Sequence, residues 1–179
     1  MKLNKIKSFI ILGLFCLTTS ANALFYGDVN LGYANTGSNS IDGWDNQKKG
    51  LLGYQVNVGI FFLPFLAAEV GYNGFTDLEY TNNNQTENPS LNGYHVALKG
   101  QVDLPIDLYV MGKVGLGSLT QSSFSNVGSQ TNYNFYWSVG AGYDLTKMFY
   151  LEAAYMQIQG SQQVPTAGLL SLGIGINLL

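Results

Sequence analysis

The chain has little cysteine, no arginine and few charges of either sign. Its one cysteine, Cys16, lies in an N-terminal segment that we predict is removed, so neither disulfides nor thiol chemistry are expected in the mature protein. Charged residues make up 11% of the chain, which is low for a soluble domain. Because arginine is absent and acids outnumber lysines, the basic surface that nucleic acid requires is excluded.

Long apolar runs are also missing after residue 23, so no transmembrane helix is predicted there. Residues 1–23 instead have the three parts of a secretory signal peptide. Three lysines come first, an apolar core spans 9–17, and Ala21-Asn22-Ala23 forms the cleavage site. The short core disfavours the alternative of a membrane anchor, and the bulky Phe15 before Cys16 disfavours a lipoprotein signal.

The predicted mature chain has the size of one domain. Removing 23 of the 179 residues leaves 156, and the loss of three of the eight lysines leaves five lysines against eleven acids, a net charge of −6. We therefore predict two segments, a signal peptide at 1–23 and one domain at 24–179.

Apolar residues alternate with other residues in eight stretches of this domain. Tyr54, Val56 and Val58 face one side, for example, whereas Gln55 and Asn57 face the other. A period of two predicts strands with two unlike faces. We place them at 25–35, 50–62, 65–78, 91–103, 107–119, 133–145, 149–160 and 167–179. The connections alternate between short ones and long polar ones at 36–49, 79–90, 120–132 and 161–166, which are expected to be solvated and mobile.

Two architectures fit this alternation: a soluble barrel or sandwich with an apolar core, and a transmembrane barrel with its apolar face toward lipid. The other face is mostly Gly, Ala and Ser, which suits a narrow, filled interior better than a water-facing sheet. Aromatic residues on the apolar face also form two groups by depth, as two lipid–water interfaces would select. The group near the long connections is Tyr33, Tyr54, Tyr72, Tyr94, Trp137 and Tyr155, and the group near the short turns is Phe25, Phe62, Tyr143 and Phe149.

We therefore predict an all-β fold, an eight-stranded antiparallel up-and-down transmembrane β-barrel in the outer membrane of a Gram-negative-type cell. The first and last strands must pair, because backbone polar groups cannot stay unpaired in hydrocarbon. The long connections are expected outside the cell. Eight strands leave an interior just wide enough to be filled by side chains, so no open pore is expected.

Four segments in this order and spacing resemble the small eight-stranded outer-membrane barrels, such as the transmembrane domain of outer-membrane protein A. They are FLAAEVGY (65–72), YVMGKVGLGS (109–118), WSVGAGYDL (137–145) and LSLGIGINLL (170–179). The resemblance covers residues 24–179 and implies recognition of the last strand by the barrel-assembly machinery. It departs from the family at Leu179, where members often end in Phe or Trp, and no peptidoglycan-binding domain follows.

Five charged residues are predicted to point into the barrel: Asp28, Glu69, Lys99, Lys113 and Glu152. Buried charges persist mainly when they are paired, so we expect ion pairs among them. Related barrels have an interior ion-pair network that plugs the lumen. The resemblance therefore implies a structural role, and the alternative is a gate that rearranges to pass small ions.

Catalysis is disfavoured. Some related barrels modify lipid A at the outer leaflet, and His95 is the only histidine that could take part. Ala97 stands two residues after it, so there is no H-x-S pair, and no serine is marked as a nucleophile. No cofactor or metal motif is present in the sequence.

The leading functional hypothesis is a surface-exposed structural protein. The barrel would support the cell envelope while its outer connections, including 36–49 with Trp44, bind a host ligand or lipopolysaccharide. The alternatives are a narrow porin-like channel for small solutes and an enzyme that modifies lipid A. Expected partners are outer-membrane lipid, lipopolysaccharide and the barrel-assembly machinery. A monomer is expected because a closed barrel leaves no open sheet edge.

Overall fold

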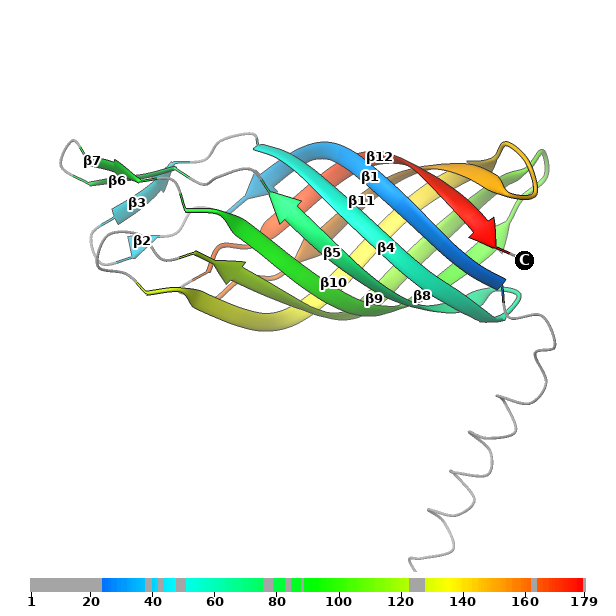
Figure 1. The fold of residues 1–179 in the computed structure, drawn as a ribbon, viewed down its shortest axis with the longest axis horizontal. Helices are drawn as coiled ribbons and strands as arrows, with labels where there is room; N and C mark the ends of the chain where they lie inside the picture. The colour runs from blue at the N-terminus through cyan, green and yellow to red at the C-terminus, as the bar shows by residue number, and fades with distance from the viewer. Residues whose placement is uncertain are drawn as a thin grey trace, which may run out of the picture.

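The computed structural model describes residues 24–37, 40–41, 44–47, 51–75, 79–82, 85–87, 89–122, 128–161 and 164–178. The predicted signal peptide lies outside these residues. Eight long strands form the main body (Figure 1). They are β1 (Leu24–Thr36), β4 (Leu51–Leu63), β5 (Leu66–Phe75), β8 (Leu91–Asp103), β9 (Leu108–Gln121), β10 (Gln130–Asp144), β11 (Phe149–Ile158) and β12 (Ala167–Leu178).

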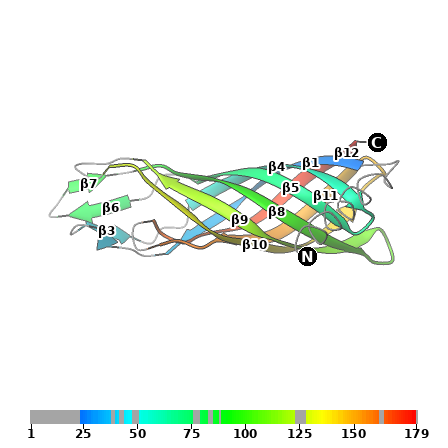
Figure 2. The ribbon, with the colours of Figure 1, turned by 90° about the horizontal axis from the view of Figure 1, so that it is seen from below.

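These strands close into one antiparallel barrel, in the order β1-β12-β11-β10-β9-β8-β5-β4. Closure is made by β1, which pairs with β12 on one side and with β4 on the other. The views in Figures 1 and 2 show a long barrel of tilted strands, with the short turns at the end where β12 stops. The predicted all-β, eight-stranded barrel is confirmed. The described part of the chain contains no helix long and apolar enough to cross a membrane.

A second, small sheet lies beyond the opposite end of the barrel (Figure 1). It consists of β2 (Ser40–Ile41), β3 (Trp44–Gln47), β6 (Glu79–Asn82) and β7 (Gln85–Glu87), in the order β2-β3-β6-β7. The connection after β1 supplies two of these strands, and the connection after β5 supplies the other two. The sequence led us to expect mobile connections here. Each connection folds into a hairpin, and β3 of one hairpin pairs with β6 of the other. This pairing gives hydrogen-bond partners to backbone N–H and C=O groups, which the composition of the segments does not reveal.

The outer wall of the barrel is apolar, as the alternation predicted. Leu31, Leu52 and Leu172 are 66%, 72% and 72% exposed, whereas the polar residues between such positions are buried inside. A soluble core would have the opposite arrangement. The exposed leucines therefore mark the wall as the lipid-facing surface of a membrane barrel.

The interior is filled and has three layers along its axis. Toward the small sheet lies an apolar layer, which consists of Ala34, Phe75, Leu91, Ala97, Leu119, Tyr136, Met156, Ile158, Val164, Ala167 and Leu169. Toward the short turns lies an aromatic collar, which consists of Tyr26, Ala67, Tyr109, Met111, Tyr150 and Ala154 with Phe61 packed against them. Between the two lies a charge network of Asp28, Glu69, Lys99, Lys113 and Glu152. We predicted an interior face of mostly small residues, and this prediction missed the large side chains of the apolar layer and of the aromatic collar.

Candidate functional site

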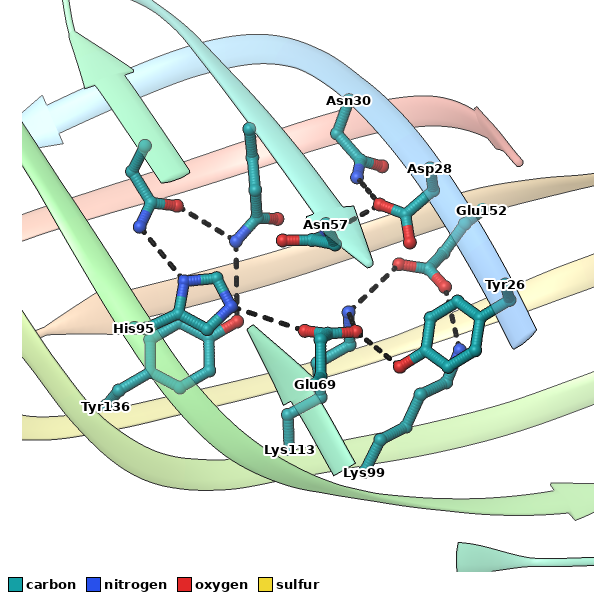
Figure 3. A network of polar contacts seen from close by, with 12 residues as sticks. Tyr26, Asp28, Asn30, Asn57, Glu69, His95, Lys99, Lys113, Tyr136 and Glu152 are labelled. Carbon is teal, nitrogen blue, oxygen red and sulfur yellow. Dashed lines mark hydrogen bonds and ion pairs between the residues drawn. The ribbon is translucent and has the colours of Figure 1, made fainter. Parts of the chain in front are cut away.

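All five charged residues that were predicted to face inward are buried in the interior, none more than 3% exposed. Lys113 holds the centre of the charge network, with its Nζ 2.8 Å from Glu69 Oε2 and 3.7 Å from Glu152 Oε1. Lys99 Nζ lies 3.5 Å from Glu152 Oε2. Figure 3 shows the two lysines and two glutamates converging from different strands. The charges of these four side chains thus compensate one another while the side chains are almost fully buried.

Asp28, the fifth member, is bound by neutral groups. Its Oδ1 accepts hydrogen bonds from the side-chain amides of Asn30 at 2.5 Å and Asn57 at 2.6 Å (Figure 3). Its Oδ2 accepts a hydrogen bond from the Tyr150 hydroxyl at 3.3 Å. These three donors surround a carboxylate that makes no direct ion pair within the described residues.

A repeated arrangement of tyrosine, glycine and carboxylate holds all three acids. In each repeat a tyrosine lies opposite a glycine of the next strand, and that glycine lies opposite an acid one strand further on. The repeats are Tyr26–Gly59–Glu69, Tyr109–Gly142–Glu152 and Tyr150–Gly175–Asp28. Each tyrosine donates its hydroxyl to the acid of its own repeat, at 2.7, 3.4 and 3.3 Å respectively.

The glycines make this reach possible. A Cβ atom at Gly59 would overlap the ring of Tyr26, and the same holds for the other two repeats. Each ring therefore lies flat across its glycine, and its hydroxyl arrives at the strand beyond. The glycines of the interior thus make room for particular large side chains, besides suiting a narrow interior.

The same three tyrosines surround the ammonium group of Lys99. Its Nζ is 4.7 Å from the ring centroid of Tyr26, 5.5 Å from Tyr109 and 5.8 Å from Tyr150, with Phe61 at 5.9 Å. Ring faces attract a cation, and the attraction increases when water is excluded. Lys99 is therefore held by the aromatic collar as well as by Glu152, which joins the collar to the charge network.

His95 lies at the other side of the network and is 2% exposed. Its Nε2 is 3.3 Å from Glu69 Oε1, and its Nδ1 is 3.1 Å from the Asn73 side-chain amide. The ring stacks on Tyr136, with centroids 4.1 Å apart and planes 9° apart (Figure 3). Its partners are thus a carboxylate, an amide and an aromatic ring. This set fixes the ring but supplies no nucleophile.

The predicted outer aromatic residues lie on the outer wall and contact one another in places. Tyr54, Tyr72 and Tyr94 form a row on three adjacent strands, with centroids 6.0 and 5.0 Å apart. Trp137 and Tyr155 form a second pair at 5.6 Å. Tyr33, Tyr143 and Phe149 are 58%, 43% and 44% exposed, and Phe62 is half-buried.

The inward-facing tyrosines were not predicted from the sequence; they are Tyr26, Tyr109, Tyr136 and Tyr150. Position parity could have found them, because Tyr26 shares a face with Asp28 and Tyr150 shares one with Glu152. The described residues contain no group of three His, Cys, Asp or Glu side chains suited to a metal ion. The described interior thus holds a buried polar network between an apolar layer and an aromatic collar.

Comparison with known proteins identifies the family of this barrel. The sequence profile of the outer membrane protein beta-barrel domain family matches residues 8–177. Comparison with curated protein sequences finds no significant match.

Solved structures share the fold at low sequence identity. Neisserial surface protein A is 17% identical with a TM-score of 0.63, over 86% of this chain and 97% of that one. The attachment invasion locus protein Ail of Yersinia pestis, in complex with the heparin analogue sucrose octasulfate, is 14% identical with a TM-score of 0.61, over 87% and 99%. The outer membrane protein OprG of Pseudomonas aeruginosa is 10% identical with a TM-score of 0.57, over 86% and 95%.

Proposed function

Because this chain belongs to the outer membrane protein β-barrel family and lies in the outer membrane, we propose that it is an anchored surface-interaction protein. The observation that carries this proposal is the small sheet β2-β3-β6-β7, built from two connections that are far apart in the sequence. Paired strands fix the shape of a surface. Binding of a partner to a surface that is already ordered costs less conformational entropy than binding to a flexible loop. The filled barrel is the anchor, and this sheet is the part that meets a partner.

The barrel itself supports the anchor role. Every barrel strand pairs on both sides, so no sheet edge is left open in the membrane, and we propose that the protein is a monomer. The charge network and the collar fill the interior with paired groups, and we propose a structural role for them. The exposed leucines and aromatic rings of the wall contact outer-membrane lipid, including lipopolysaccharide. Insertion by the barrel-assembly machinery and removal of residues 1–23 as a signal peptide belong to the same proposal.

The charge of the outer connections limits the kind of partner. The segments 36–50, 76–90, 122–129 and 159–166 together carry five acids, two lysines and no arginine. The relative Ail was solved with a heparin analogue, a highly sulfated sugar. An acidic surface repels such a polyanion, so we propose a neutral or basic partner for this chain. Heparin immobilised on beads is expected to retain no purified protein, and retention that decreases with salt would contradict this assignment.

Replacement of the first outer connection tests the main proposal. Residues 38–49 would be exchanged for a Gly/Ser linker of equal length, which removes β2 and β3, and cells that express the variant would be tested for attachment to cultured epithelial cells. The matched control exchanges residues 123–127 in the connection between β9 and β10. Heat-dependent mobility on a gel reports whether each barrel is folded.

Loss of attachment in the first variant alone, with both barrels folded, supports the proposal. Equal attachment by cells with the first variant and cells with the unaltered protein would overturn it. The proposal would also be overturned if cells with the unaltered protein attached no better than cells that lack the protein. A catalytic role for His95 has no comparable support, because the side chain is buried among Glu69, Asn73 and Tyr136. An unchanged lipid A mass spectrum after expression is the expected result.

A further inference from the structure

The apolar layer extends across the whole interior of the barrel. Seven of the eight barrel strands contribute a buried side chain to it, from Ala34 on β1 to Leu169 on β12. The eighth strand, β4, contributes buried Gly53. A Cβ atom there would lie 2.8 Å from Leu169 Cδ1, 3.2 Å from Ala34 Cβ and 3.4 Å from a ring carbon of Phe75. The layer is therefore in contact with the barrel wall on every strand.

The connection after β11 completes the layer from above. Val164 is 1% exposed and belongs to the apolar layer, and Pro165 beside it is also buried. The Ser161 backbone N–H donates to the Val164 carbonyl at 2.8 Å. The Gly37 N–H donates to the Thr166 carbonyl at 2.8 Å, which ties this connection to the end of β1. Residues 164–166 thus place an aliphatic side chain in the layer and are joined to the end of β1.

We infer that the apolar layer closes the outer end of this barrel to ions, independently of the charge network below it. An ion needs water or polar groups along its entire path, and an apolar constriction excludes both. The charge network lies below the layer, between it and the aromatic collar. A rearrangement of Lys99 and Glu152 changes contacts within the charge network only. The apolar layer still blocks the path from the network to the cell exterior.

Labelling of a Ser138→Cys reporter by a charged methanethiosulfonate reagent, added from the extracellular side to cells that express the full chain, tests this inference. Ser138 lies on β10, opposite Lys113, and is 3% exposed. One variant, Lys99→Met, breaks the charge network. A second, Leu119→Ser with Leu169→Ser, breaks the apolar layer. The matched control, Leu116→Ser with Leu170→Ser, makes the same exchange on the lipid-facing side, where these residues are 71% and 60% exposed. Heat-dependent gel mobility again reports folding.

Fast labelling of the reporter is expected in the apolar-layer variant alone. Protection is expected in the otherwise unaltered protein, in Lys99→Met and in the lipid-facing control. Faster labelling with Lys99→Met and the layer intact would overturn the inference. A folded apolar-layer variant that stays protected would overturn it as well.

If the apolar-layer variant does not fold, labelling of the reporter with and without Lys99→Met decides the matter. Protection in both proteins supports the inference, and labelling that becomes faster with Lys99→Met contradicts it.

Discussion

Removal of the Lys113 charge is the most direct test of how the charge network is held together. Its ammonium group lies 2.8 Å from one glutamate and 3.7 Å from another, and the side chain is 1% exposed. Lys113→Met keeps a side chain of similar length and leaves Glu69 and Glu152 without their shared cation. Breaking one side of a buried ion pair costs about 3–5 kcal/mol, because the remaining charge stays buried without compensation. We expect a loss of this size in the free energy of unfolding.

Urea unfolding in lipid vesicles, followed by the heat-dependent gel shift, measures this loss as a lower midpoint concentration. The matched control is Lys147→Met, because Lys147 is exposed in the turn between β10 and β11. A surface change of this kind alters stability by about 0.5 kcal/mol or less. If Lys113→Met were to cost as little as Lys147→Met, the reasoning about a buried, mutually compensating network would be refuted.

A double variant separates charge imbalance from poor packing. Lys113→Met together with Glu69→Gln removes one charge of each sign, so the excess of carboxylates over lysines returns to its original value. We expect the double variant to be more stable than Lys113→Met alone, with a coupling energy of about 0.5–3 kcal/mol between the two sites. A double variant less stable than the single one would mean that packing, and not charge, accounts for the loss.

Two further predictions concern the wall. Gly59→Ala should lower the free energy of unfolding by about 1–3 kcal/mol, because the new Cβ overlaps the ring of Tyr26. Gly100→Ala should be tolerated, because the nearest neighbour of its new Cβ is a carbonyl oxygen at 3.9 Å. The urea midpoints of the two variants make the comparison. Leu172→Lys, in the middle of β12 and 72% exposed to lipid, should cost about 2–4 kcal/mol, but Leu178→Lys at the end of the strand only about 0–1 kcal/mol. Equal unfolding free energies within either pair would contradict the reasoning.

Residue alternation could predict which charges enter the barrel, but not which of them meet. Glu69 and Lys99 lie on the inward face by parity, and the sequence shows that directly. The contact between Lys99 on β8 and Glu152 on β11 crosses the interior between strands that do not pair. It depends on the stagger of all the strands around the barrel, which is a property of closure and not of any one segment.

The outer connections could not be predicted for a different reason. Asn, Ser, Thr and Gly are abundant in 36–49 and 79–90, and this composition is typical of solvated loops. The pairing of Asp45 with Thr81 joins the two segments across 36 residues of sequence. Such a pairing arises because the barrel brings the ends of β1, β4, β5 and β8 to the same rim, so the local sequence carries no signal for it.

The repeats of tyrosine, glycine and carboxylate explain why a membrane barrel keeps charges inside at all. A shift of β1 against β4 by one residue would move every side chain to the wrong face, which the lipid already forbids. A shift by two residues preserves the faces, and hydrophobic alternation does not oppose it. It would, however, place Tyr26 opposite Asn57 or Phe61 instead of Gly59, so the ring could not lie flat and its hydroxyl could not reach Glu69. The other two repeats impose the same condition between β9 and β10 and between β11 and β12. The network therefore selects one closure among those that the apolar pattern permits, which is a task that a uniformly apolar filling would perform poorly.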